Sequence, residues 1–197
     1  MHVSRRILVL AVALCTVAAF GSAALAGGSN PNLVQNGGFE RPSVNQTSDF
    51  ESFTAGDTID DEDEWTVDSG TVDLVEEETW DAFRGEQAID LNGNSRGSIS
   101  QEVDTEAGDD YLLRFHLAGN PGCTETNKVK VLNVYWDEEL VATFYYDTTG
   151  QTTSNIDWQL RVLELSGDQE DTELRFASAN DGNCGPMIDA VSLRMIG

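Results

Sequence analysis

The chain has 197 residues, and 35 aspartates and glutamates against 11 lysines and arginines give it a formal net charge of −24 at pH 7. Nucleic acids and anionic membrane surfaces are bound through basic footprints, so this balance argues against both as partners. We interpret most of the acids as a solvated surface suited to high salt, and keep a few as candidates for binding calcium.

Residues 1–26 have the pattern of a secretory signal peptide. Ser4-Arg5-Arg6 precedes an apolar run over residues 7–19, and Ala24-Leu25-Ala26 supplies a small-x-small cleavage pattern. The apolar run is too short for a spanning helix, so no membrane insertion is predicted. The basic end fits a Sec or a twin-arginine signal. We therefore predict one domain over residues 27–197 that is secreted, either free or associated with the cell surface.

The rest of the chain is predicted as an all-β sandwich. Short runs alternate between apolar and polar residues, turns rich in Gly, Asp and Asn separate them, and no stretch keeps a helical period. Many short strands of this kind favour a sandwich over an α/β fold. Residues 41–64 are predicted as a long polar loop. In chain order the predicted strands cover residues 32–40, 65–67, 71–75, 86–91, 97–103, 111–117, 130–136 and 141–146 (a hairpin), 158–165, 173–178 and 188–193.

The last strand is predicted to return to the first one and close the sandwich. It follows a Gly185-Pro186 turn, and Ile188, Val191 and Leu193 can supply its buried face. Asp189 lies just inside this strand, where a carboxylate is costly to bury without a cation or hydrogen-bond donors.

The cysteines that follow the signal peptide predict a disulfide. Cys123 and Cys184 form an even pair in a chain expected to be exported, whereas Cys15 lies within the signal. The alternative is two free buried thiols. A metal site at these cysteines is less favoured, because His116 is the one histidine left as a partner.

Several stretches together resemble the bacterial choice-of-anchor C family and the plant cell-wall proteins that carry the domain of unknown function 642. The resemblance implies a galactose-binding-like jelly roll, the architecture of many carbohydrate-binding modules. The plant proteins associate with cell-wall polysaccharide, notably pectin, and with wall-modifying enzymes. The sorting signal usual in the bacterial proteins is not visible, which favours a free or loosely associated protein. The matching stretches are residues 32–40, Trp65-x-Val67-x-Ser69-Gly70-x-Val72-Asp73, residues 88–93 and 97–101, Tyr111-x-Leu113-x-Phe115, residues 118–120, and Gly185-Pro186-x-Ile188-Asp189-x-Val191-x-Leu193.

The resemblance also implies a structural calcium between the two ends of the domain. It places Glu40 and Asp189 as side-chain ligands, with backbone oxygens near Gly38. Carboxylate and carbonyl oxygens are the ligands that calcium prefers. The alternative is that Glu40 and Asp189 cap strand ends or accept hydrogen bonds from turn amides.

A sugar-binding surface is expected to combine aromatic rings with planar polar side chains. Trp80 and Tyr135 are the candidate aromatic residues, and Arg114 and His116 the candidate polar ones. Most aromatics in a sandwich belong to its core, so Trp80, which lies in an acidic stretch, is predicted to be the best exposed. Direct binding of an acidic glycan would be opposed by repulsion, which favours a neutral glycan or a calcium-bridged uronate.

No catalytic site is predicted. A glycosidase needs two carboxylates, but among 35 acids some pair is inevitable and carries no signal. A Ser-His-Asp site has no support, since no nucleophile elbow is present. We predict a secreted, non-catalytic protein that binds extracellular or cell-wall polysaccharide. The alternative is an extracellular matrix or surface protein that binds other proteins.

Overall fold

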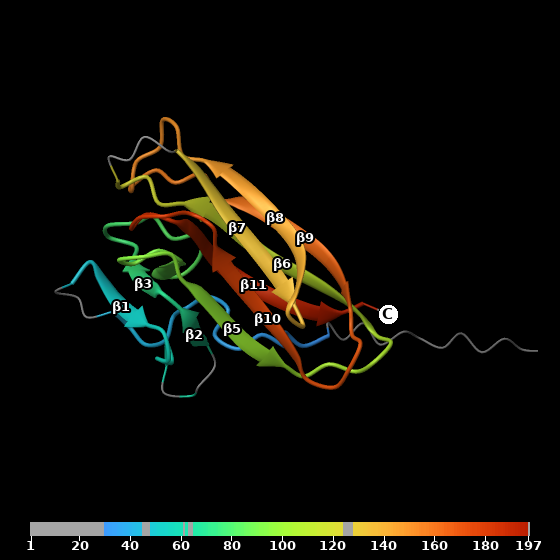
Figure 1. Cartoon of the computed structure of the whole chain (residues 1–197). Helices are drawn as coiled ribbons and strands as arrows, with labels where there is room; N and C mark the ends of the chain where they lie inside the picture. The colour runs from blue at the N-terminus through green and yellow to red at the C-terminus, as the bar shows by residue number, and fades with distance from the viewer. Residues whose placement is uncertain (1–29, 45–47, 61, 63–64, 124–127, 197) are drawn as a thin grey trace, which may run out of the picture.

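The computed structural model describes residues 30–44, 48–60, 62, 65–123 and 128–196. These residues form two antiparallel sheets packed face to face, and the described part contains no helix (Figure 1). The strands are β1 (Phe50–Thr54), β2 (Thr66–Ser69), β3 (Thr71–Glu76), β4 (Gln87–Asp90), β5 (Ser98–Val103), β6 (Asp110–Gly119), β7 (Val129–Trp136), β8 (Glu139–Asp147), β9 (Gln159–Ser166), β10 (Thr172–Ser178) and β11 (Pro186–Met195).

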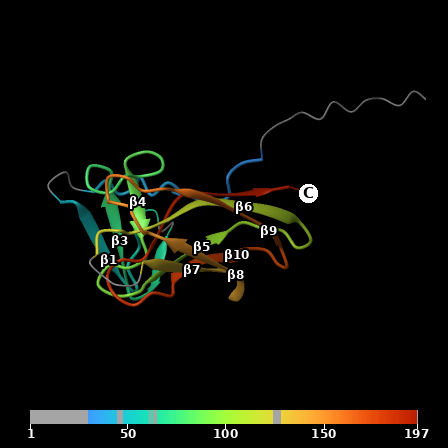
Figure 2. The ribbon, with the colours of Figure 1, turned by 90° about the horizontal axis from the view of Figure 1, so that it is seen from above.

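The chain crosses repeatedly from one sheet to the other. The six-stranded sheet has the order β1-β3-β4-β11-β6-β9, and the five-stranded sheet has the order β2-β5-β10-β7-β8. The chain passes between the layers from β2 to β3, from β4 to β5 and from β5 to β6, as in jelly rolls. Figure 2 shows β6 and β9 in one layer and β5, β10 and β7 in the other. The predicted all-β jelly-roll sandwich is confirmed.

The core fills the space between the sheets and follows from alternation along the strands. In β6, Tyr111, Leu113, Phe115 and Leu117 are buried on one face, while Arg114 on the other face is exposed. Phe176 of β10 meets the Phe115 ring at 5.1 Å between centroids, so the two sheets touch through aromatic rings. Burying such side chains stabilises the fold by roughly 1.5–3 kcal/mol each.

The two ends of the described chain lie side by side, as predicted. The Leu33 amide donates to the Leu193 carbonyl at 2.9 Å, and the Val191 amide donates to the Gly37 carbonyl at 2.7 Å. Segment 32–37 thus flanks the C-terminal half of β11, beyond the two residues of β11 that pair with β4. We call the contact between residues 32–40 and β11 the terminal seam.

The predicted strand over residues 32–40 is wrong in its conformation. Asn36 and Phe39 have positive φ angles of 44° and 57°, outside the extended region, and the first strand of the described chain begins only at Phe50. The Asn32 side chain replaces a backbone group, because its Oδ1 accepts from the Leu193 amide at 2.8 Å. A Cβ on Gly37 would lie 2.1 Å from the Val191 carbonyl oxygen, so only glycine allows this close approach.

The prediction of an unbroken loop over residues 41–64 is also wrong, because it contains β1. This strand pairs with β3 from Phe50 opposite Val75 to Thr54 opposite Thr71. It buries Phe53 and leaves its other residues exposed, so it has little apolar signal. The strands predicted from residue 65 onward are all present, and β7 and β8 form the predicted hairpin.

Cys123 and Cys184 form the predicted disulfide, with their Cα atoms 6.0 Å apart. The predicted signal peptide over residues 1–26 lies outside the described residues. Within the described ranges, no helix has the length and apolar character needed to cross a membrane.

Candidate functional site

A cleft opens over the outer face of β1 and β3, where several loops converge. Its volume is about 220 Å³. The floor comes from the outward-facing residues of β1 and β3, and the walls come from the loops that follow β3, β4 and β6 and the one that precedes β11. We call it the loop cleft. It is lined by Phe50, Ser52, Asp73, Val75, Trp80, Gly93, Asn94, Asn120, Gly122, Cys123, Asn183 and Cys184.

Two aromatic rings stand in the loop cleft. Phe50 is 46% exposed, and its ring meets Trp80 edge-on with 6.2 Å between centroids. Trp80 is half-buried and packs partly against the core, so it is less exposed than the sequence predicted. Its indole Nε1 donates to Asn120 Oδ1 at 3.1 Å, which fixes the ring plane.

Polar groups surround these rings. The exposed side chains of Asn94 and Asn183 lie on the walls, and half-buried Asp73 lies on the floor. Burial raises the pKa of Asp73, against the hydrogen bond that Ser52 Oγ donates to its Oδ1 at 2.6 Å. The disulfide joins two of the walls, because Cys123 and Cys184 both line the cleft.

The loop over residues 77–86 connects the loop cleft with the terminal seam. It is closed at its base by a 2.8 Å bond from the Glu77 amide to the Glu86 carbonyl. It carries Trp80 at one end, and further along the Phe83 ring stacks on His116 at 3.3 Å between centroids. The Arg84 amide then donates to Asp189 Oδ2 at 2.8 Å. The 77–86 loop therefore covers the outer face of the six-stranded sheet.

The terminal seam brings Glu40 and Asp189 together. Asp189 is fully buried, and its carboxylate accepts from the amides of Arg84 and Ala190. Burial raises the pKa of Asp189 to about 7, and the charge of Glu40 adds to this against those donors. Glu40 itself accepts from the Glu86 amide at 3.0 Å and the Gln87 amide at 3.3 Å.

The calcium ion that the resemblance places at Glu40 and Asp189 stays a prediction. A buried aspartate whose pKa is raised beside a second carboxylate is a place where a divalent cation would relieve repulsion. Gly38 and Glu40 line an opening at the seam, so oxygen atoms there can be reached from solvent. No group of three or more His, Cys, Asp or Glu gathers as a metal site among the described residues, so backbone oxygens and water would have to complete the shell.

The four residues predicted to bind sugar do not come together. Trp80 lines the loop cleft, whereas Arg114 and His116 lie on the outer face of β6. His116 is covered by Phe83, and burial lowers its pKa. Tyr135 lies on β7 in the other sheet, where the Arg175 guanidinium stands 4.2 Å from its ring centroid. Which of the four touch a ligand stays a prediction.

Sequence reasoning missed most of the cleft. Phe50 lies in a polar stretch and Asp73 in a strand, so neither stands out in the sequence as a binding residue. Asn94, Asn120 and Asn183 lie in three separate loops, and the sequence does not show that these loops meet. The available signal was the recurrence of Asn beside Gly directly after or before a strand.

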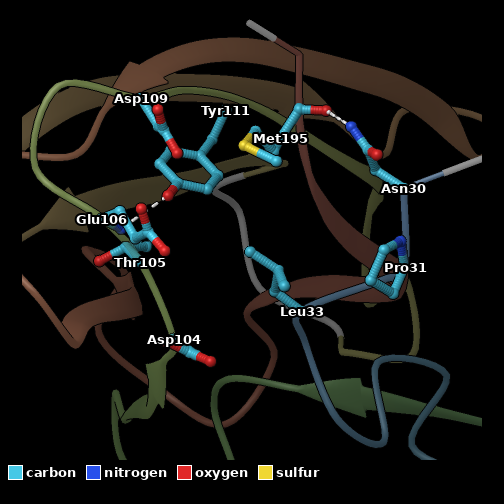
Figure 3. A pocket seen from close by; sticks show the side chains of 9 residues that line it. All are labelled: Asn30, Pro31, Leu33, Asp104, Thr105, Glu106, Asp109, Tyr111 and Met195. Carbon is cyan, nitrogen blue, oxygen red and sulfur yellow. Dashed lines mark hydrogen bonds between the residues drawn. The ribbon is translucent and has the colours of Figure 1, made fainter.

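A second pocket lies at the opposite ends of β6 and β11 (Figure 3). The side chains of Asp104, Glu106 and Asp109 lie on one side of the apolar side chains of Leu33 and Met195 (Figure 3). Tyr111 is buried there and its hydroxyl accepts from the Glu106 amide at 2.8 Å, so it offers no open ring face. The loop cleft, with two accessible rings, is the better candidate for ligand binding.

Residues 32–194 match the family described as "Protein of unknown function (DUF642)". The chain is also 31% identical over 196 residues to halomucin of Haloquadratum walsbyi (strain DSM 16790 / HBSQ001), a match that covers 95% of this chain. It spans about 2% of the length of that much larger protein.

Among solved structures, similarity is found to carbohydrate-binding modules. A family 35 module from Clostridium thermocellum is 15% identical at a TM-score of 0.47, covering 73% of this chain and 97% of that one. A family 35 module from an environmental isolate is 14% identical at a TM-score of 0.45, and the match covers 77% of this chain and 90% of that one. TmCBM61 in complex with β-1,4-galactotriose is 18% identical at a TM-score of 0.44, and the match covers 84% of this chain and 99% of that one. They carry no residue and no ligand over to this chain.

Proposed function

The chain belongs to the DUF642 family, and from that premise we propose that it is a secreted, non-catalytic carbohydrate-binding protein whose ligand lies in the loop cleft. The family description names no activity, so the proposal is supported by the cleft. The resemblance to the choice-of-anchor C family stays a prediction.

The observation that carries the proposal is the pairing of rings and amides in one opening. Sugar rings have apolar faces that pack on aromatic side chains, and hydroxyls that pair with a few fixed polar groups. Trp80 and Phe50 supply the rings, and Asn94 and Asn183 supply exposed donors and acceptors. Because these groups are mostly uncharged, a neutral part of an extracellular polysaccharide fits best.

The carboxylates of the cleft support binding without catalysis. A glycosidase places two carboxyl groups on either side of the bond to be cleaved. Among the described residues that line the loop cleft, Asp73 is the one carboxylate. Asp90 lies beneath it, fully buried and held by hydrogen bonds, and cannot reach a bound sugar.

A structural calcium at the terminal seam is part of the proposal. Glu40 and Asp189 would hold it with backbone oxygen near Gly38. The ion would supply positive charge that offsets two carboxylates brought together by closure of the sandwich. It would stabilise the seam, and through the 77–86 loop it would favour the order of the cleft.

A glycan array with and without calcium tests this function. We expect retention of extracellular polysaccharides that falls at least tenfold for Trp80→Ala. Tyr145→Ala is the matched control, because Tyr145 is 67% exposed and lies on β8, away from the cleft. Turnover of a polysaccharide by the purified protein would contradict the non-catalytic proposal.

Protein binding is the second candidate, and a specific surface favours it. The edge strands β8 and β9 expose large apolar side chains, namely Leu140, Val141, Tyr145, Leu160 and Val162. Exposed apolar side chains on strand edges are a place where another chain can dock. No retained glycan under either condition, together with a protein partner lost on Leu160→Ser, would favour this candidate over carbohydrate binding.

A further inference from the structure

Asp90 lies beneath the loop cleft and binds three of its walls. The side chain is 1% exposed. Its Oδ1 accepts from the Asn92 amide at 2.9 Å and from the Gly185 amide at 3.0 Å. Its Oδ2 accepts from Asn120 Nδ2 at 2.7 Å. These three donors come from the loop after β4, the segment that precedes β11 and the end of β6.

Asn120 links Asp90 to the Trp80 ring of the loop cleft. Because its amide nitrogen is turned toward Asp90, its Oδ1 faces the other way and accepts from Trp80 Nε1 at 3.1 Å and from the Gly122 amide at 2.8 Å. An amide has one donor end and one acceptor end, so a carboxylate on one side decides which end faces the indole. The backbone N–H of Asn120 also donates to the Gly185 carbonyl at 2.9 Å, which closes the network.

We propose that Asp90 is a positioning residue of the loop cleft, which sets the ring plane of Trp80 through Asn120 and the spacing of the walls through Asn92 and Gly185. The role in ligand binding rests on the proposed function, whereas the effect on Trp80 does not. Asp90 touches no ligand itself.

The hydrogen-bond partners of Asp90 suit its ionised form, whereas its burial favours the protonated form. Its partners are three N–H donors, and a protonated carboxyl would turn a donor of its own toward one of them. Burial raises the pKa of Asp90 to about 7, and the charge of Asp73 adds to this against the three donors. Cleft order is therefore expected to rise as the pH passes upward through about 7.

Charged groups lie near Asp90 on β3 and on β7. Asp73 of β3 lies opposite it in register, and on β11 its register partner is Met187, which does not titrate. On β7, buried Lys130 donates through Nζ to the Cys184 carbonyl at 2.7 Å, next to Gly185. Asn92, Asn120 and Trp80 complete the surroundings and do not titrate.

The indole N–H signal of Trp80 in ¹H–¹⁵N spectra gives a readout that a purely structural role would not move selectively. Trp80→Phe assigns the signal, and the signals of Trp65, Trp136 and Trp158 are internal references. The variants are Asp90→Asn, which keeps the side-chain size, and Asn120→Ala, which removes the side chain that joins Asp90 to Trp80. Asp104→Asn, at the opposite end of the sandwich, is the matched control.

We expect the wild-type Trp80 signal to titrate near pH 7, the titration to vanish in Asp90→Asn, and the signal to shift in both variants but not in Asp104→Asn. Affinity for xylan, β-1,4-galactan or polygalacturonate tetrasaccharides should fall at least fivefold in both variants. If the Trp80 signal is unchanged in Asp90→Asn and in Asn120→Ala, the proposal is overturned. If the Trp80 signal responds but no tetrasaccharide binds to the wild type, the positioning role of Asp90 stands and the proposed carbohydrate-binding function is contradicted.

Discussion

The loop cleft and the terminal seam each contain a buried aspartate that follows an isoleucine in a strand, yet the two carboxylates have different surroundings. Asp90 follows Ile89 in β4, and Asp189 follows Ile188 in β11. Burial raises the pKa of each to about 7. Asp90 accepts from N–H groups of three cleft walls, whereas Asp189 accepts from backbone amides of the 77–86 loop and of β11 and has the Glu40 carboxylate beside it.

The difference shows how one chemical group serves two purposes. Where donors outnumber the charge, as around Asp90, a buried carboxylate fixes loops in place. At the terminal seam the donors come from the 77–86 loop and from β11 itself, and the second carboxylate, Glu40, is exposed, so a cation from solvent would offset the negative charge there.

Removing the disulfide should have the largest effect on stability. Cys123 and Cys184 are 61 residues apart, and chain entropy for such a loop corresponds to about 4 kcal/mol. Cys123→Ser with Cys184→Ser should lower the free energy of unfolding by that order, measured by urea denaturation. The loss should fall first on the cleft, so hydrogen exchange should quicken near Asn120 before it does at Val191. Equal exchange at both places would contradict a separation of the two regions.

The pH dependence of stability should come next in size. A group whose pKa is higher in the folded state keeps its full stabilising contribution below about pH 4 and loses it as the pH rises through about 7. In calcium-free buffer, the free energy of unfolding should therefore fall by a few kcal/mol between pH 4 and pH 8. Asp90→Asn and Asp189→Asn should each flatten part of this slope.

A wild-type profile that rises over this range, measured by denaturant titration at each pH, would contradict the assignment. Asp104→Asn is the control, since Asp104 is exposed and should leave the slope unchanged.

Calcium should stabilise the protein through the seam alone. At a calcium concentration 100 times the dissociation constant, a single site adds about 2.7 kcal/mol. For a domain of this size that corresponds to a rise in melting temperature of roughly 5–10 °C. Glu40→Gln and Asp189→Asn should abolish the rise, and Asp90→Asn should keep it. A melting temperature unaffected by calcium or by chelator would count against the ion.

The smallest effects are expected from residues on the outer sheet faces. Arg114→Ala and Tyr135→Ala should change glycan affinity by less than about twofold, because neither side chain lines the loop cleft. Isothermal titration calorimetry of glycan binding, with Trp80→Ala measured as the variant expected to lose affinity, would check this. A larger loss for either variant would move the binding surface to the corresponding sheet face.

Most strands could be predicted because their alternation reports the buried face directly. β6 and β10 show this clearly, with every second side chain in the core. Segment 32–40 was predicted as a strand, but it lies along β11 without forming one, because Asn36 and Phe39 take left-handed conformations. β1 was missed because four of its five residues are exposed.

The seam was predictable and the cleft was not, for a physical reason. Glu40 and Asp189 lie in contiguous stretches at the two ends of the domain, and the contact between those ends brings the pair together. The cleft gathers Phe50, Asn94 and Asn183 from separate loops, whose meeting depends on the packing of both sheets. Asp90 could have been singled out as Asp189 was, since an acid within an apolar strand signals a buried carboxylate in both.

Mapping a bound glycan by chemical-shift perturbation tests the central claim most directly. The proposal predicts that shifts on titration gather at the Trp80 indole and at the side-chain amides of Asn94, Asn120 and Asn183. Shifts confined to β7 around Tyr135 or to β6 around Arg114, or no shift with any extracellular polysaccharide, would contradict it.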